Sequence, residues 1–481
     1  MYAWLIISVV FGYFALLLSV AYFTSRKADN EDFFVGGRKS SWWLVSYGMI
    51  GASLSGITFI SVPGWVLTNQ FAYFQMVLGY VLGYAFIALV LLPVYYRLRL
   101  TSIYSYLGER FGPVSEKTGS VFFLISRLIG ASLRLYVVVS VLHFLVLDAL
   151  GVPVWLTVIM TIMLIWIYTY RGGIKTIVWT DTLQTTFMLL AVAGTFIILL
   201  KEAGWSFGDF WQQMSSEGIS KTFFFEDWKD GRFFWKQFFS GAFITIVMTG
   251  LDQDMMQKNL SCKTLSEAKK NVYGLSLSLV VVNFIFLLLG ALLVLYARKS
   301  GIAVADSDNL YSAVLMHTGS RFLLVVFVVG LIAAAFSSAD SALTALTTSF
   351  TIDILEADKK MDSKGLQKVR IISHLLISGL VIGVVLLFAA IKNEAVISSL
   401  FKIAGYTYGP LLGLYFAGLF TRIKVNDWLV PLVAVLSVGI TYWVAQNISH
   451  ILGGYKVSFE LLIFNGLVTF LLLLLFRRKR H

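Results

Sequence analysis

The chain has 481 residues, of which 58% are hydrophobic and only 13% are charged, and its mean hydropathy is +0.81. Soluble domains carry roughly 25% charged residues, so this composition excludes a soluble or disordered chain and predicts an all-α polytopic membrane protein. The single cysteine, Cys262, excludes an intramolecular disulfide and a cysteine metal cluster. The five histidines lack the spacing of a zinc site.

The sequence contains thirteen apolar stretches long enough to cross roughly 30 Å of hydrocarbon as helices. The predicted spans are 2–23, 42–66, 71–96, 119–149, 154–170, 178–200, 237–256, 272–297, 321–350, 370–391, 396–420, 428–446 and 459–476. The first stretch has no basic segment before it and no small-residue cleavage site after it, so it is predicted to be a retained helix rather than a signal peptide.

The basic residues concentrate in alternate loops between these spans. Arg26 and Lys27 follow the first span, and Lys258 and Lys263 follow the seventh. Cytoplasmic loops carry such an excess of Lys and Arg, which predicts an outside N-terminus, a cytoplasmic C-terminus and an odd number of spans in a cytoplasmic (inner) membrane. The net charge of +12 is therefore attributed to the cytoplasmic face of the bilayer rather than to nucleic-acid binding. No linker indicates a separate soluble domain, and no obligate protein partner is evident.

The second span contains a stretch that is poorly suited to a continuous membrane helix. Residues 51–58 read Gly-Ala-Ser-Leu-Ser-Gly-Ile-Thr, and Pro63 follows shortly after. A break in the helix here would free backbone carbonyls for a hard cation such as Na⁺ and hydroxyls for a solute. The alternative is close helix packing by small residues.

The ninth span contains a second group of oxygen-bearing side chains. Ser337 and Ser341 lie one helical turn apart, Ala334 lies one turn earlier, and Asp340 lies on an adjoining part of the surface. Hydroxyl and carboxylate oxygens suit an alkali cation. The alternative is that the serines bond back to their own helix.

Further ionisable residues lie in predicted spans, where charge is costly and therefore indicates function, and three of them are candidates for the site. Asp181 begins the sixth span and is a candidate cation ligand or, alternatively, an N-cap carboxylate. Arg127 and Arg134 lie two turns apart in the fourth span. Each is a candidate for bidentate recognition of a carboxylate or, alternatively, for a structural ion pair.

No nucleotide-binding loop of the form GxxxxGK[ST] occurs, and nothing in the sequence supports an enzyme. Transport would therefore draw on an ion gradient. A channel should contain a filter loop or pore-lining rings, and a membrane sensor should carry an output domain. Neither feature is found.

Taken together, five stretches resemble the sodium:solute symporter family, whose members carry sugars, proline, vitamins, iodide or sialic acid with Na⁺. The matching stretches are 32–38, 51–64, 172–181, 252–257 and 337–353. The resemblance implies a five-plus-five inverted-repeat core within a single transmembrane domain, 1–481. The extra helix would be 2–23, the first repeat 42–200, the second repeat 237–420, and the two C-terminal helices 428–476.

The resemblance also implies one or two sodium sites. The first would use backbone carbonyls of Gly51, Leu54 and Ala334 with the hydroxyls of Ser337 and Ser338.

A second sodium site, similar to that of sialic-acid members, would use Asp181, Ser337, Asp340 and Ser341. Asp340 departs from the serine expected at its position. A second carboxylate near Asp181 should strengthen the attraction for a cation or, when no cation is bound, favour protonation of one of the two carboxyl groups through like-charge repulsion.

For the solute, the resemblance to sialic-acid members implies an anionic, hydroxylated molecule as the small-molecule partner. The candidate solute-binding residues are Ser53, Ser55, Thr58, Tyr73, Gln75, Arg127 and Arg134. The sialic-acid members use an arginine in the fourth span, and Arg127 fits its local context slightly better than Arg134 does. Two alternatives stay open, namely a sodium-coupled sugar or amino-acid symporter and a proton-coupled carrier that uses Asp181 and Asp340.

Overall fold

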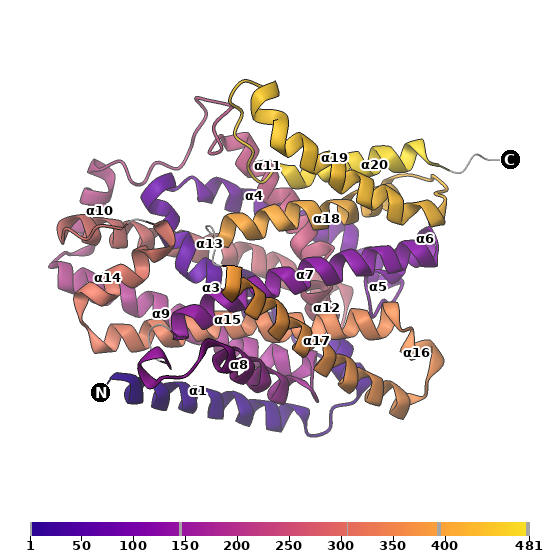
Figure 1. The fold of residues 1–481 in the computed structure, drawn as a ribbon, viewed down its shortest axis with the longest axis horizontal. Helices are drawn as coiled ribbons and strands as arrows, with labels where there is room; N and C mark the ends of the chain where they lie inside the picture. Colours follow the sequence, from indigo (N-terminus) through magenta and orange to yellow (C-terminus); the bar gives the residue numbers. More distant parts are fainter. Residues whose placement is uncertain (1, 144–146, 305, 392–395, 478–481) are drawn as a thin grey trace.

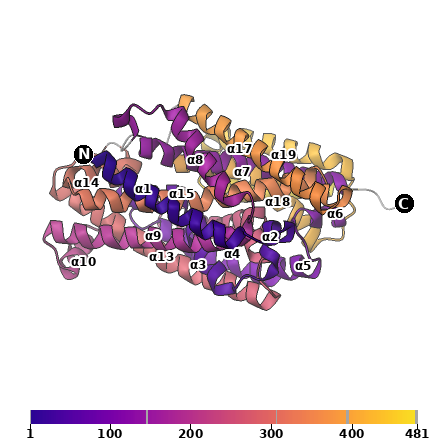
Figure 2. The same ribbon diagram turned by 90° about the horizontal axis from the view of Figure 1, so that it is seen from below.

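The computed structural model describes residues 2–143, 147–304, 306–391 and 396–477. The long helices run roughly along one common axis, and α1 begins at the opposite end of the bundle from the end of α20 (Figures 1 and 2). In the described part of the chain, every predicted span overlaps a helix. These helices are α1 (Tyr2–Ser25), α3 (Trp42–Asn69), α4 (Tyr73–Phe86), α7 (Pro113–Leu142), α8 (Val154–Thr169), α9 (Ile174–Ala203), α11 (Phe234–Thr245), α13 (Leu265–Lys299), α15 (Arg321–Ser349), α17 (Ser363–Ile391), α18 (Val396–Phe420), α19 (Val430–Ile451) and α20 (Leu461–Leu475).

Shorter elements connect or extend the long helices. The short α-helices are α2 (Asn30–Val35), α5 (Leu92–Arg97), α6 (Ser105–Arg110), α10 (Phe207–Ser216), α12 (Gln253–Leu260), α14 (Leu310–Thr318) and α16 (Ala357–Lys360). The π-helical segments are η2 (Ile87–Leu91), η5 (Ile246–Gly250) and η7 (Phe350–Ile354). The 3₁₀ turns are η1 (Gly36–Arg38), η4 (Asp148–Leu150), η6 (Ser307–Asn309) and η8 (Asp427–Leu429).

Among the described residues, eight helices are long and apolar enough to cross a membrane, and one bent pair within α3 makes up to nine. Val154–Thr169 and Leu461–Leu475 are apolar but shorter. An all-helical, multi-pass architecture is thus confirmed, while the number thirteen stays a prediction.

The predicted break in the second span is present. Trp42–Gly56 and Thr58–Asn69 meet at an angle of 58°. Ser55, at the bend, has φ 51° and ψ 167°, which is a conformation that non-glycine residues rarely adopt. α3 therefore consists of two half-helices, and it packs against α9, α13 and α15 near the middle of the molecule.

The span predicted over 237–256 is not one helix, and this prediction was wrong. α11 passes into the π-helical η5, and the chain turns before α12 begins. The Asp252 side chain accepts hydrogen bonds from the backbone N–H groups of Asp254 and Met255 and so caps a new helix. A capping carboxylate at this position ends one element and starts the next.

Candidate cation site and solute cavity

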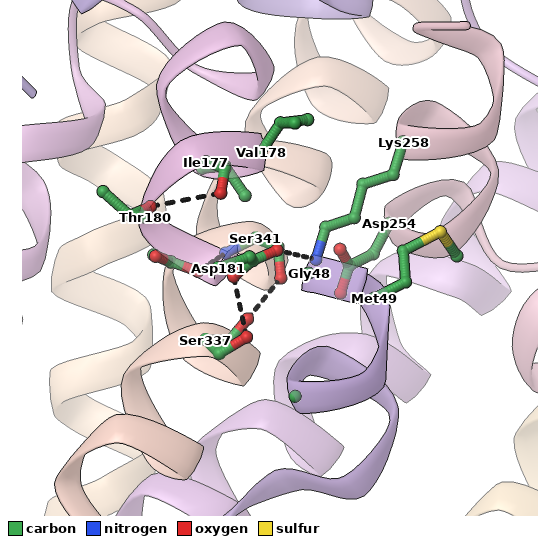
Figure 3. Close-up of polar contacts among 12 residues, drawn as sticks. Gly48, Met49, Ile177, Val178, Thr180, Asp181, Asp254, Lys258, Ser337 and Ser341 are labelled. Carbon is green, nitrogen blue, oxygen red and sulfur yellow. Dashed lines mark hydrogen bonds and ion pairs between the residues drawn. The ribbon is translucent and has the colours of Figure 1, made fainter. Parts of the chain in front are cut away.

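A buried polar cluster joins α9, α12 and α15 (Figure 3). At its centre lies Asp181, which is 1% exposed. Ser337 donates a hydrogen bond to Asp181 Oδ1 at 2.7 Å, and Lys258 Nζ lies 2.7 Å from Asp181 Oδ2. The N-cap of α9 is Gly173, whereas Asp181 is its eighth residue, so the N-cap alternative for Asp181 is wrong.

Lys258 is the partner that the sequence analysis missed. It was assigned there to a basic loop, but the structure places it in α12 with only 1% of its side chain exposed. Its one available signal was its position, directly after the matched stretch 252–257. A single lysine in a polar stretch cannot be distinguished from a loop residue by composition alone.

Asp340, also fully buried, lies on the same part of α15. Its carboxylate accepts hydrogen bonds from the Tyr168 hydroxyl at 2.9 Å and from the Ser341 backbone at 2.6 Å. Among the described residues, no Lys, Arg or His nitrogen lies within 4.0 Å of it. Ser341 donates to the Ser337 carbonyl at 2.8 Å, which is the back-bonded arrangement considered for this helix. The cluster thus holds two carboxylates and one ammonium group.

The first half of α3 approaches this cluster closely because residue 51 is a glycine. A Cβ atom at Gly51 would lie 2.5 Å from Thr185 Oγ1 and 3.3 Å from Ser337 Oγ. Ser338 Oγ is buried, and it has no hydrogen-bond partner in the described structure. A buried polar group without a hydrogen-bond partner costs folding free energy, so this hydroxyl is well placed to bind a ligand.

A cavity of about 110 Å³ lies beside the bend of α3. Six of the seven candidate solute residues line it. They are Ser53, Ser55, Thr58, Tyr73, Arg127 and Arg134. Ser53 Oγ is buried and has no hydrogen-bond partner among the described residues.

Gln75, the seventh candidate, is not among the residues that line the cavity. Its side chain is fully buried, its Nε2 donates to the Arg232 carbonyl at 2.9 Å, and its Oε1 accepts from the Phe224 backbone at 3.1 Å. Both ends of the amide are therefore committed to the segment that joins α10 and α11.

The two arginines of the cavity differ in their partners. Arg127 forms an ion pair with Asp254, and its guanidinium also lies 3.6 Å from Asp252. In the described part of the structure, Arg134 has no carboxylate within 4.0 Å. None of the described residues that line the cavity is acidic. The cavity therefore presents one guanidinium, that of Arg134, without a bound counter-charge.

Other polar lining residues were missed by the sequence analysis, namely Tyr80, Tyr84, Thr245, Thr249 and Asn283. Asn283 Oδ1 is buried without a hydrogen-bond partner in the described structure. The sequence does contain an indication that Asn283 is functional, because an amide in the middle of the apolar stretch 272–297 is unusual in a membrane span.

A second, larger cavity of about 810 Å³ shares Trp65 and Tyr73 with the first. The Trp65 ring contacts the Tyr73 ring edge-on at 5.4 Å between centroids and stacks on Phe459 at 6.3 Å. These rings lie between the small cavity and a wider vestibule.

A sequence model of the sodium:solute symporter family matches residues 33–422. The chain belongs to this family. It is a sodium-coupled symporter of a small solute, and the resemblance seen in the motifs is confirmed. The match covers the bend of α3, Asp181, Lys258 and the serines of α15.

Two curated relatives are similar along most of their length. The sodium/sialic acid symporter SiaT of Proteus mirabilis is 26% identical over 442 residues, which cover 86% of this chain and 84% of the relative. The sodium/sialic acid symporter NanT of Aliivibrio fischeri is 26% identical over 459 residues, covering 90% and 86%. The solved structure of a Na⁺-coupled sialic acid symporter in a substrate-bound, outward-open state superposes with a TM-score of 0.84 at 20% identity, over 99% of this chain and 98% of that one. That likeness establishes the fold.

Proposed function

We propose that this symporter uses the Na⁺ gradient to import a small hydroxylated organic anion, with a sialic acid as the leading candidate. One observation carries the proposal. The solute cavity has no acidic lining residue, and Arg134 in its wall lacks a carboxylate partner among the described residues. A guanidinium binds a carboxylate through two parallel hydrogen bonds, and such a pair is both strong and geometrically selective. The two similar sialic acid symporters support the same substrate class.

In this proposal, Arg134 binds the carboxylate of the solute, while Ser53, Ser55, Thr58 and Tyr73 bind its hydroxyl groups. Arg127 is assigned a different role, because Asp252 and Asp254 already neutralise it. Through these ion pairs, Arg127 would hold the start of α12 against α7.

The first sodium ion is proposed to bind to the carbonyls of Gly51, Leu54 and Ala334 and to the hydroxyls of Ser337 and Ser338. The unpartnered Ser338 hydroxyl and the close approach of Gly51 to Ser337 support this site. The backbone at Ser55 departs from helical geometry, and a helix that is bent in this way can present carbonyl groups of the kind that a hard cation needs.

A second sodium ion is proposed at Asp181, Ser337, Asp340 and Ser341. With both buried carboxylates ionised, the single ammonium group of Lys258 leaves one negative charge, and one monovalent cation would balance it.

The proposed membrane arrangement has thirteen spans, with the inverted repeats at 42–200 and 237–420, one extra helix at 2–23 and two at 428–476. The N-terminus would lie outside and the C-terminus in the cytoplasm of a bacterial cell. The opposite placement of the start of α1 and the end of α20 supports an odd number of crossings (Figure 1).

The deciding experiment is uptake into proteoliposomes under an inward Na⁺ gradient, with choline replacing Na⁺ in the control at constant pH. The panel contains a sialic acid, a neutral hexose, proline and a monocarboxylate. We expect uptake of the sialic acid in Na⁺ and none in choline. Uptake of the neutral sugar or amino acid alone would overturn the anionic assignment.

The proton-coupled alternative, raised by the buried carboxylates Asp181 and Asp340, is disfavoured by the family to which the chain belongs, and the same assay tests it. It predicts uptake in choline when a proton gradient is imposed, and abolition of that uptake by a protonophore. Uptake that follows Na⁺ at zero proton gradient excludes this candidate.

A further inference from the structure

Lys258 is a buried cation placed at the carboxylate that is proposed to bind Na⁺. Only 1% of its side chain is exposed, and its Nζ atom lies 2.7 Å from Asp181 Oδ2 (Figure 3). Asp181 Oδ1 accepts a hydrogen bond from Ser337 at 2.7 Å. Both oxygens of the carboxylate are thus engaged by donors, and the stronger of these partners is itself positively charged.

A Na⁺ ion at Asp181 would meet the Lys258 ammonium group at short range. Both cations need the same carboxylate oxygens, and in a buried site their mutual repulsion is only weakly screened. The Ser337 hydroxyl would also have to rotate, so that its oxygen faces the ion instead of its proton facing Asp181. Simultaneous occupation of Asp181 by Na⁺ and Lys258 is therefore unfavourable.

We propose that the Lys258 ammonium is a tethered cation that occupies Asp181 in place of Na⁺, and that Na⁺ enters this site only by displacing it. The proposal rests on the proposed second sodium site and adds a way in which Na⁺ binding at that site is controlled. Asp340 has no basic nitrogen within 4.0 Å among the described residues, and in its ionised form it would attract the incoming ion while Lys258 still holds Asp181.

The element that carries Lys258 also reaches the solute cavity. In the eight-residue helix α12, Asp254 pairs with Arg127, Met255 lines the cavity, and Lys258 holds Asp181. Displacement of Lys258 would release one end of this short helix while its other end stays against the cavity wall. Exchange of Lys258 for Na⁺ is thus a route by which ion binding alters the solute site.

The test compares wild type, Lys258→Gln, Lys258→Arg and the charge-balanced double variant Asp181→Asn/Lys258→Gln. Each purified protein is titrated with NaCl in choline chloride at constant ionic strength, and the melting temperature and Na⁺-driven uptake are recorded. In Lys258→Gln, we expect half-maximal stabilisation at a Na⁺ concentration lower by roughly tenfold or more, the scale on which one adjacent charge shifts an ionic equilibrium. Lys258→Arg should behave like wild type. The double variant, which lacks the Asp181 carboxylate, should not show the higher Na⁺ affinity expected for Lys258→Gln.

Lys258→Gln leaves Asp181 without its counter-charge and could unfold in choline. In that case, the proposal requires that added Na⁺ restore the folded protein, because the ion replaces the missing ammonium group. An unchanged or weaker Na⁺ affinity in folded Lys258→Gln, or a failure of saturating Na⁺ to restore it, overturns the proposal. Absence of any Na⁺ effect on the stability of wild type would instead refute the proposed sodium sites themselves, which distinguishes their failure from that of the Lys258 proposal.

Discussion

Replacement of Arg134 by glutamine removes the guanidinium that lacks a carboxylate partner among the described residues, while it keeps a polar side chain of similar length. Because Arg134 lines the cavity and makes no ion pair in the described structure, its loss leaves no buried carboxylate uncompensated. We therefore expect the variant to fold with a melting temperature close to that of wild type. The effect should be confined to solute binding.

The magnitude follows from the contact that would be lost. A hydrogen bond to a charged group contributes about 1.5–3 kcal/mol. Since 1.4 kcal/mol corresponds to a tenfold change in affinity, the solute should bind about 10- to 150-fold more weakly to Arg134→Gln. Arg134→Lys keeps the charge but loses the planar pair of donors, so its affinity should be intermediate.

Arg127→Gln is the matched control, because it removes the other arginine of the same cavity. It leaves Asp252 and Asp254 buried without their counter-charge. Removing one partner of a buried ion pair lowers the free energy of unfolding by about 3–5 kcal/mol, so this variant should be less stable than wild type even without solute.

Calorimetric binding in Na⁺ buffer and thermal unfolding in detergent separate the two effects. A carboxylate solute and its neutral amide analogue are compared on all variants. Arg134→Gln should reduce the preference for the carboxylate over the amide. The reasoning is refuted if Arg134→Gln binds the carboxylate as tightly as wild type does, or if it weakens both analogues equally.

Gly51→Ala should weaken Na⁺ binding several-fold, because the new methyl group would lie 2.5 Å from Thr185 Oγ1 and force α3 away from the cluster. A Na⁺ titration of the melting temperature measures this change in affinity. Ser338→Ala removes an unpartnered hydroxyl, so its cost should appear as weaker Na⁺ affinity, by about 2- to 10-fold, with little loss of stability in choline. Ser55→Gly should raise the melting temperature in choline by relieving up to about 1–3 kcal/mol of backbone strain at φ 51°, and an unchanged or lower value would contradict the strain.

The sequence predicts the features that depend on local composition. Apolar runs place the long helices, and the glycines and hydroxyls of 51–58 place the bend at Ser55, because a helix break is decided by residues close together in the chain. The resemblance to the family pairs Asp181 with Ser337, a contact that residue spacing alone does not reveal.

Partners that come from distant segments were not predicted. Lys258 was assigned to a loop and Gln75 to the solute, because the identity of a polar side chain does not indicate what it meets across the fold. Arg127 shows the same limit, since its local sequence context favoured it slightly over Arg134 as the solute ligand. The carboxylates of α12, which lie far from both arginines in the sequence, neutralise only Arg127.

The shared use of α3 gives a physical basis for coupling. Gly51 and Leu54, proposed sodium ligands, flank Ser53, whose hydroxyl lines the solute cavity, and Ser55 at the bend also lines it. An ion held by these carbonyls would fix the half-helix that presents Ser53, so the solute would no longer bear the entropic cost of ordering it. Binding linkage is reciprocal, so the factor by which Na⁺ strengthens solute binding must equal the factor by which solute strengthens Na⁺ binding. Any variant that disconnects the two halves of α3 should reduce both factors together, whereas loss of Arg134 should weaken the solute and leave Na⁺ affinity without solute unchanged.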